Sequence, residues 1–313
     1  MMNAQGQNIA LFERTMLLPD PEAQERLSRL VGLDDQKLRL SKMLGTLINS
    51  AGLVAWASRF HPGAEDFVSD ILRRPPLVVL SGDVGSGKTE LAETIGDMVA
   101  RQEDIEITLL PMSLSTRGQG RVGEMTQMVT AAFDHAVQEA SKLLSSQGKA
   151  RGGVILLIDE ADALAQSRVS SQMHHEDKAG VNAFIRGIDR LANGSLPAAV
   201  IMCTNRLSAL DPAVKRRAAE ILVFKRPQLE QRNLVLTSAL TPFGLTAVEI
   251  EALVDATGET NERNHGFAFS DLTQRLIPSI ILDAYPSSKV TASRALKIAR
   301  QTIPTPPFQD GVS

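Results

Sequence analysis

A glycine-rich segment that ends in a lysine and a threonine has the residue types and the spacing of a phosphate-binding loop. Gly82, Gly87, Lys88 and Thr89 fit the pattern G-x-x-x-x-G-K-[ST]. Glycines let backbone N–H groups turn toward an anion, and the positive end of the following helix points at the same anion. Lys88 would bind the β- and γ-phosphates of ATP, and the Thr89 hydroxyl would bind Mg²⁺. The candidate nucleotide-binding residues here are Asp83, Val84, Gly85, Ser86, Gly87, Lys88 and Thr89.

Two carboxylates follow a later apolar run. The segment GVILLIDEAD places Asp159 and Glu160 directly after five apolar residues. In a parallel sheet this edge lies beside the phosphate loop, so Asp159 would accept hydrogen bonds from water ligands of Mg²⁺. Glu160 would orient and deprotonate the attacking water. A strand that leads into an Asp-capped helix is the structural alternative, but the position downstream of a phosphate loop favours hydrolysis.

An amide and a pair of arginines complete a hydrolytic set. Asn205 ends the apolar run AAVIMCTN, where it would hydrogen-bond the γ-phosphate or the attacking water, or cap the next turn. Arg216 and Arg217 lie on the far side of the predicted core from the phosphate-loop helix. A guanidinium there does not easily reach the nucleotide of its own chain. We therefore expect Arg216 or Arg217 to complete the site of a neighbouring subunit.

Alternating strands and helices would position these residues. Apolar runs predict buried strands that begin at Leu77, Ile105, Gly153, Ala198 and Glu220. The pattern predicts an α/β fold with a parallel five-stranded sheet over residues 30–226. A turn containing Gly32 precedes the first strand; it is a candidate adenine contact or simply a helix-capping loop.

The rest of the chain divides into three smaller parts. Residues 1–29 are predicted to form a short N-terminal segment. Pro227 marks a hinge, and helical periodicity continues from there to residue 303, which predicts a small all-helical lid domain. Residues 304–313 are proline-rich and predict a flexible tail.

Composition narrows the class of protein. The 313 residues include 43% hydrophobic and 22% charged residues, which is typical of a folded globular chain. The net charge of −3 gives no overall electrostatic footprint for nucleic acid. Cys203 is the single cysteine, so a disulfide framework and a cluster of thiolate metal ligands are excluded. Without a secretory leader or a long apolar stretch, we expect a cytoplasmic protein that does not span a membrane.

Taken together, GDVGSGKT, LLIDEAD, IMCTN and LDPAVKRR, followed by a helical lid, resemble an AAA+ ATPase over residues 30–303. Within that superfamily, LSRLVGLDD, GVNAFIRGIDRL and GFAFSDLTQRLIP are similar to the pachytene-checkpoint, thyroid-receptor-interacting group. Those proteins are hexameric remodellers of HORMA-domain proteins. The resemblance implies ATP and Mg²⁺ as cofactors, a homo-hexamer and a HORMA-domain partner.

The resemblance also assigns roles to single residues. It places Lys88 and Thr89 in Walker A, Asp159 and Glu160 in Walker B, Asn205 at sensor 1, and Arg216 or Arg217 at the arginine finger. The family's sensor 2 begins with Gly-Arg where this chain has Asp271-Leu272. Arg275, one helical turn later, is the nearby candidate for that role.

A glycine-rich loop over residues 112–123 would face the pore of such a ring. Eukaryotic members of the group carry an aromatic residue there, whereas this loop has Arg117-Gly118-Gln119. Grip on a substrate would then come from Arg117 and Arg121; a plain flexible linker is the alternative. Eukaryotic members also have an N-terminal adaptor-binding domain, for which the segment before residue 30 is too short. The chain therefore resembles bacterial members found with HORMA proteins and cyclic-oligonucleotide synthases in anti-phage systems.

Three functions follow from these patterns. The leading one is an ATP-driven ring that engages a flexible segment of a HORMA-domain complex in its pore and negatively regulates an anti-phage system. The second is an AAA+ nucleic-acid machine such as a clamp or helicase loader, which the acidic charge balance makes less favoured. The third is a nucleotide switch that hardly turns over, which the hydrolytic set of Glu160, Asn205 and the arginine pair disfavours.

Overall fold

The structure is a computed structural model that describes residues 11, 12, 14–114, 124–144, 150–164, 175–260 and 263–307. The described chain forms two compact units. The sheet unit draws on Met1–Ser28, Asp35–Ser81 and Thr89–Val223, and the second, helical unit draws on Arg29–Asp34, Gly82–Lys88 and Phe224–Ser313. The phosphate-loop segment therefore packs with the helical unit, although it connects two elements of the sheet unit.

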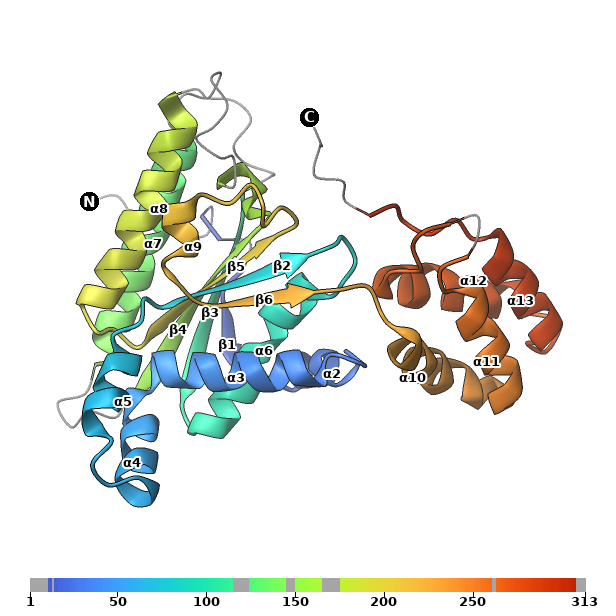
Figure 1. Cartoon of the computed structure of the whole chain (residues 1–313), viewed down its shortest axis with the longest axis horizontal. Coiled ribbons are helices and arrows are strands. Elements are labelled where there is room, and N and C mark those ends of the chain that lie inside the picture. The colour runs from blue at the N-terminus through green and yellow to red at the C-terminus, as the bar shows by residue number, and fades with distance from the viewer. Residues whose placement is uncertain are drawn as a thin grey trace. The chain divides into compact units, whose positions relative to one another are not determined.

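Figure 1 labels the elements along the chain. The strands are β1 (Met16–Leu18), β2 (Leu77–Gly82), β3 (Glu106–Ser113), β4 (Gly152–Asp159), β5 (Ala198–Thr204) and β6 (Ala218–Phe224). The helices of the sheet unit are α2 (Pro21–Ser28), α3 (Asp34–Ile48), α4 (Ser50–Phe60), α5 (Glu65–Leu72), α6 (Lys88–Glu103), α7 (Glu124–Lys142), the 3₁₀ turn η1 (Ala161–Leu164), α8 (His175–Asn193) and α9 (Pro212–Lys215). The helical unit contains α10 (Leu229–Leu240), the 3₁₀ turn η2 (Thr241–Phe243), α11 (Ala247–Ala256), the π-helical turn η3 (Asp271–Leu276), α12 (Ile277–Ala284) and α13 (Ala292–Gln301).

The predicted α/β fold is confirmed, with one strand more than the sequence indicated. In the described chain the sheet has the order β1-β3-β4-β5-β2-β6, and β3, β4, β5 and β2 are parallel neighbours. The additional strand, β1, pairs antiparallel with β3 at the edge. Three residues are too short to show an alternating pattern. The expected parallel five-stranded sheet is therefore corrected by a sixth strand, which is antiparallel and lies at its edge.

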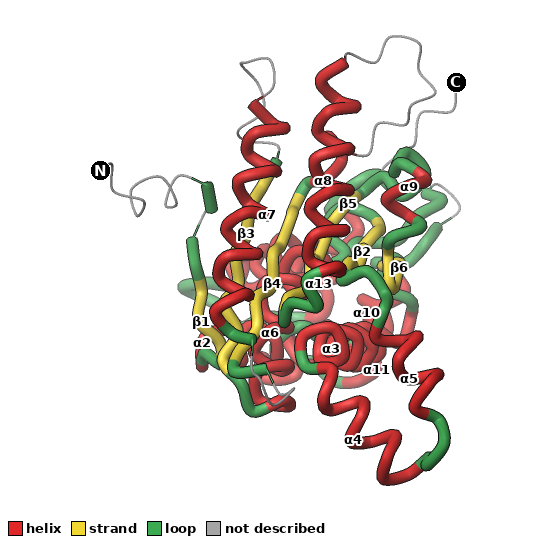
Figure 2. The backbone as a smooth tube through the Cα atoms, turned by 90° about the vertical axis from the view of Figure 1, so that its left-hand side faces the viewer, coloured by secondary structure: helices red, strands yellow, loops and turns green. Residues whose placement is uncertain are grey.

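Helices cover both faces of the sheet. Figure 2 shows α7 and α8 running alongside the strands on one face. On the other face, α3 approaches so closely that an added Cβ at Gly153 of β4 would lie 2.4 Å from Ile48 of α3, and an added Cβ at Gly96 of α6 would lie 3.3 Å from Ile155 of β4. Strands buried on both faces read as continuous apolar runs, which is why the sequence revealed them.

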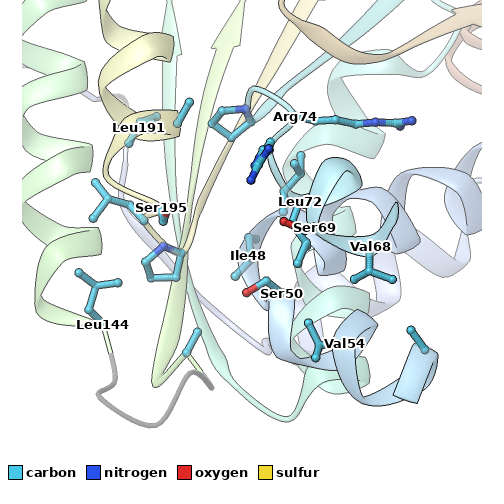
Figure 3. Close-up of a pocket in the computed structure, with 18 residues that line it drawn as sticks. Ile48, Ser50, Val54, Val68, Ser69, Leu72, Arg74, Leu144, Leu191 and Ser195 are labelled. Atoms are coloured by element: carbon cyan, nitrogen blue, oxygen red, sulfur yellow. The ribbon is translucent and has the colours of Figure 1, made fainter. Parts of the chain in front are cut away.

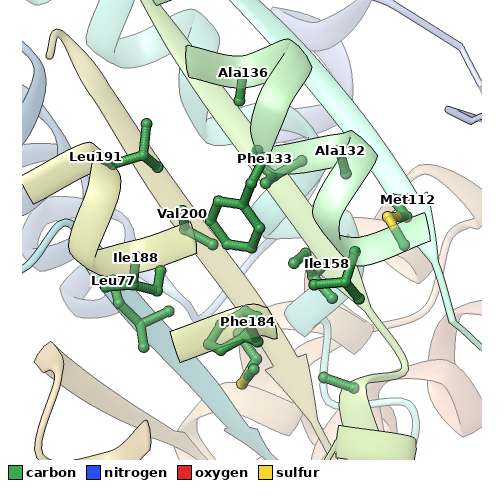
Figure 4. Close-up of a cluster of buried hydrophobic side chains, with 14 of the residues drawn as sticks. Leu77, Met112, Ala132, Phe133, Ala136, Ile158, Phe184, Ile188, Leu191 and Val200 are labelled. Atoms are coloured by element: carbon green, nitrogen blue, oxygen red, sulfur yellow. The ribbon is translucent and has the colours of Figure 1, made fainter. Parts of the chain in front are cut away.

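The core between α7, α8 and the sheet is centred on two phenylalanines. The rings of Phe133 and Phe184 meet edge to face, with centroids 5.6 Å apart (Figure 4). A Cβ at Gly187 would lie 2.3 Å from Phe133 Cγ, so α8 can approach α7 only with a glycine at this position. The tight packing of α7 and α8 supports the sheet. The polar residues of the candidate site lie at the carboxyl edge of that sheet.

The N-terminal segment is fixed to α6 by charged contacts. The Arg26 guanidinium donates to Glu90 Oε1 at 2.7 Å and to Glu93 Oε2 at 2.5 Å. The backbone N–H of Asp20 donates to the buried Asp97 carboxylate at 2.8 Å. The start of α6 carries Thr89, so these contacts hold the helix that follows the phosphate loop.

The chain from α10 to α13 (residues 229–301) is mostly helical, as the sequence predicted. Its helices bury an apolar core of its own, formed by Leu236, Leu240, Ile250, Leu253, Phe267, Leu272 and Leu276. In the described residues, none of the helices combines the length and the apolar character that crossing a membrane requires.

Candidate active site

The phosphate loop lies between the end of β2 and the start of α6. Lys88 is buried, and its ammonium donates to the carbonyl oxygens of Gly82 at 2.9 Å and Asp83 at 2.8 Å. Gly85 has a φ of +73°, and a Cβ there would lie 1.9 Å from Ser270 Oγ. Only glycine satisfies both conditions. The lysine is therefore directed along the inside of its own loop, where phosphate oxygens would take over its hydrogen bonds.

The two predicted carboxylates lie together at the carboxyl edge of the sheet. Asp159 is the last residue of β4, and its Oδ1 accepts a hydrogen bond from the Glu160 backbone N–H at 2.8 Å. Glu160 has a φ of +52°, which is uncommon for a residue with a side chain. The Ser113 hydroxyl, at the end of the neighbouring strand β3, donates to Glu160 Oε2 at 2.7 Å. The backbone turn and the serine together set the direction of this exposed carboxylate.

Ser113 was not predicted from the sequence as a partner of Glu160. The signal was present, because a hydroxyl residue ends the strand IEITLLPMS just as a carboxylate ends LLID. What the sequence did not show was that β3 and β4 are neighbours, with Ser113 opposite Asp159.

Asn205 follows β5 and is held by Asp162, a second residue that was not predicted from the sequence. The Asn205 side-chain amide donates to Asp162 Oδ2 at 3.2 Å, and its backbone N–H donates to Oδ1 at 3.0 Å. The Thr204 hydroxyl donates to the same Oδ1 at 2.5 Å. Asp162 thus fixes the Asn205 side chain through the amide nitrogen. This contact also determines where the amide oxygen of Asn205 points.

We expect Asp162→Ala to lower the rate of ATP hydrolysis at saturating ATP by roughly 10- to 100-fold, because a small displacement of a positioning group has an effect of that size. The change should appear in kcat rather than in KM for ATP, since Asp162 contacts Asn205 and not the phosphate loop. Steady-state kinetics checks this, with Asp134→Ala as the control, which removes a partly exposed carboxylate of α7 that pairs with Arg190. A wild-type kcat for Asp162→Ala would contradict the role given to Asn205.

The two candidate finger arginines have different surroundings. Arg217 donates to both carboxylate oxygens of Asp189, with Nε–Oδ1 at 2.8 Å and Nη2–Oδ2 at 3.0 Å. This hydrogen bond raises the pKa of Arg217. Arg216 ends the short helix α9 and is exposed, and within the described chain its side chain makes no ion pair. The geometry favours Arg216 as the group able to reach another molecule.

Gly32 and Arg275 both lie in the helical unit. The Gly32 carbonyl accepts a hydrogen bond from Gln231 Nε2 at 2.6 Å, so this turn is fixed to the start of α10. The Arg275 guanidinium donates to Asp271 Oδ1 at 3.1 Å. Burial would raise the pKa of Asp271, but hydrogen bonds from Ala268, Thr305 and Arg275 outweigh it and lower that pKa. Asp271 therefore stays ionised and holds the candidate sensor arginine.

Two sets of predicted residues remain to be placed. Arg117, Gly118, Gln119 and Arg121 of the predicted pore loop lie outside the described residues. Thr89 and Asp159 supply the oxygen donors that Mg²⁺ prefers. Within the described chain there is no group of three or more His, Cys, Asp or Glu side chains able to hold a metal ion.

A pocket of about 580 Å³ lies elsewhere in the sheet unit (Figure 3). Its lining includes Pro76 and Pro197, which precede β2 and β5, together with Val54, Val68 and Leu191. These residues lie at the amino edge of the sheet, whereas Asp159 and Asn205 lie at the carboxyl edge. The pocket is therefore separate from the candidate active site.

Comparison with known proteins finds a family match over the segment that contains the candidate site. The family described as "ATPase family associated with various cellular activities (AAA)" matches residues 78–226, which include the phosphate loop, both carboxylates, Asn205 and the arginine pair. CD-NTase-associated protein 6 of Escherichia coli (strain MS 115-1) is 64% identical over 309 residues, covering 99% of each chain.

Two solved structures are similar over nearly the whole chain. A chain of the structure titled "Structure of E. coli MS115-1 HORMA:CdnC:Trip13 complex" has a TM-score of 0.89 and 64% identity, covering 96% of this chain and 99% of that chain. The "Structure of Rhizobiales Trip13" has a TM-score of 0.76 and 57% identity, covering 95% of this chain and 100% of that chain.

Proposed function

The chain belongs to the AAA family of ATPases, among the relatives of CD-NTase-associated protein 6, and from this we propose that it uses ATP hydrolysis to remodel a HORMA-domain protein. The observation that carries the proposal is the 64% identity, over almost the full length, to a protein solved in complex with HORMA and CdnC. The alignment covers 99% of each chain and so extends well beyond residues 78–226, which match the ATPase family.

We propose the following division of labour at the nucleotide. Lys88 and the backbone N–H groups of the phosphate loop bind the phosphates, and Thr89 and Asp159 bind Mg²⁺ directly or through water. The ion, when bound, neutralises charge that develops on the phosphates. Glu160 takes a proton from the attacking water. Asn205, fixed by Asp162, directs its carbonyl oxygen or its remaining N–H toward the water or the γ-phosphate.

We also propose an assembly. An exposed Arg216 that completes a neighbour's site requires a neighbouring subunit, and a closed ring of six is the assembly that the family resemblance implies. The partner is a HORMA-domain protein, bound to a cyclic-oligonucleotide synthase as CdnC is in the related complex. Separation of the HORMA protein from the synthase would switch off synthesis, so the ATPase would act as a negative regulator of an anti-phage system in the cytoplasm.

The alternative is a nucleic-acid machine such as a clamp or helicase loader. The net charge of −3 argues against a broad nucleic-acid surface. No separate observation favours this alternative.

The two functions are distinguished by what accelerates ATP hydrolysis. We expect a HORMA-domain protein bound to its synthase, as in the related complex, to raise the hydrolysis rate several-fold, because engaging the substrate gates the conformational step. DNA of either strandedness should leave the rate at its basal value. Size-exclusion chromatography should show loss of the HORMA–synthase complex with ATP but not with a non-hydrolysable analogue. Stimulation by DNA alone would overturn the proposal.

A variant of the predicted pore loop tests how the substrate is engaged. Arg117→Ala with Gly118→Ala should abolish separation of the HORMA–synthase complex, because the arginine that would hydrogen-bond the substrate backbone is removed. Basal hydrolysis, measured in parallel, reports whether the loop contacts the nucleotide. Separation at the wild-type rate would show that the loop is only a linker.

A further inference from the structure

A single arginine, Arg226, joins three segments of the helical unit. It lies in the linker between β6 and α10, and each of its guanidinium nitrogens donates to a different segment. Nε donates to Asp83 Oδ2 at 2.7 Å, Nη1 to the Gly266 carbonyl at 2.7 Å, and Nη2 to the Thr305 carbonyl at 2.8 Å. The side chains of Arg226 and Asp83 are only 14% and 15% exposed, so this ion pair is well shielded from solvent.

Asp83 is an unexpected residue at this position. It is the first residue after Gly82 in a loop whose task is to bind a polyanion, and an unpaired carboxylate there would repel phosphate. Its other oxygen, Oδ1, accepts from the Val84 backbone N–H at 3.0 Å, and its carbonyl accepts from Lys88 Nζ at 2.8 Å. The carboxylate is thus part of the loop's own framework, and Arg226 supplies the positive charge that balances it.

The partners of Arg226 are themselves fixed. The buried Asp271 carboxylate accepts hydrogen bonds from the Thr305 backbone N–H at 3.0 Å and from the Thr305 hydroxyl at 2.7 Å. These two bonds fix Thr305, whose carbonyl oxygen accepts from Arg226. The loop has a second attachment, because the Ser270 backbone N–H donates to the Gly85 carbonyl at 3.0 Å. Arg226 is therefore a rigid element rather than a mobile surface side chain.

We propose that Arg226 is a positioning residue for nucleotide binding: it neutralises Asp83 and ties the phosphate loop to the linker that leads into α10. The inference rests on the phosphate loop being the ATP site. Neutralisation of Asp83 by Arg226 predicts an order of nucleotide affinities among the variants that simple loss of packing would not produce. Removal of the arginine alone exposes the carboxylate and is the most harmful change, whereas removal of both charges restores much of the binding.

The test measures the Kd of a fluorescent ATP analogue for purified variants, together with KM and kcat. Arg226→Gln should raise Kd roughly tenfold, the size expected for one uncompensated charge near the phosphates. Arg226→Lys keeps the charge and should raise it less. The double variant Asp83→Asn/Arg226→Gln should recover most of the loss, and KM should rise in parallel with Kd. Arg294→Met, which breaks the Arg294–Asp283 pair in the same unit, is the matched control and should bind as wild type does.

The outcomes separate this inference from the proposed function. Arg226→Gln with wild-type affinity would overturn the inference, and so would a double variant as weak as Arg226→Gln. Thermal unfolding of each variant identifies loss of folding; if Arg226→Gln does not fold, the comparison of Arg226→Lys with the double variant decides, because neutralisation predicts that both bind. Lys88→Ala is the reference. If Lys88→Ala binds nucleotide as wild type does, the phosphate loop is not the ATP site. If Lys88→Ala loses binding while Arg226→Gln binds as wild type does, only the role of Arg226 is contradicted.

Discussion

Glu160→Gln is expected to lower the rate of ATP hydrolysis by roughly 10²–10⁴-fold, the range for removal of a general base, while nucleotide binding is retained. Glutamine has the same shape and can still accept the hydrogen bond from the Ser113 hydroxyl, so the local structure should be kept. It cannot take a proton from water. The measurement is phosphate release at saturating ATP, with the Kd of a fluorescent nucleotide measured on the same protein.

Ser113→Ala is the informative companion to this variant. It leaves the base in place but removes the group that directs it, so its kcat should fall less than that of Glu160→Gln. Lys88→Ala should show the opposite pattern, with loss of nucleotide binding. If Glu160→Gln turned over at the wild-type rate, another group would have to activate the water.

Arg216→Ala is expected to lower hydrolysis by roughly 10³–10⁵-fold, the range for arginine fingers in other phosphoryl-transfer enzymes. Arg217→Ala should have a much smaller effect on kcat, because its guanidinium is engaged by Asp189 within the same chain. That pair is partly exposed, so its loss should lower the free energy of unfolding by about 0–1 kcal/mol. Steady-state kinetics and thermal unfolding of the two single variants measure the difference.

A mixing experiment shows whether Arg216 acts in another subunit. Arg216→Ala subunits retain their own phosphate loop, and Lys88→Ala subunits retain the finger. Together they should form some interfaces with both groups intact, so the mixture should be more active than either variant. Full activity of the wild-type protein as a monomer at high dilution would exclude a finger supplied in trans.

The residues that carry the chemistry were recognisable in the sequence for a physical reason. A phosphate loop needs glycines and a lysine at fixed spacing, so Gly82, Gly87, Lys88 and Thr89 are identifiable without a fold. Strands covered by helices on both faces must be apolar throughout, which made the strands at the core visible and placed Glu160 and Asn205 at their ends. The helical C-terminal part was likewise visible from its periodicity.

Other features depend on residues that are distant in sequence. Ser113 contacts Glu160, and Asp83 contacts Arg226 143 residues later, because strand order and packing bring them together. The edge strand β1 is defined by its pairing with β3 and not by its own three residues.

The choice between Arg216 and Arg217 also shows what the sequence determines and what only the tertiary structure determines. The sequence determined that basic residues follow α9, because the pattern LDPAVKRR identifies them as finger candidates. It did not distinguish Arg216 from its neighbour, since both are arginines in adjacent positions. The tertiary structure distinguished them by placing Asp189 of α8 within hydrogen-bonding distance of Arg217 and leaving Arg216 exposed. Residue type and spacing determine which chemistry is possible, and the packing of distant segments determines which side chains are available to perform it.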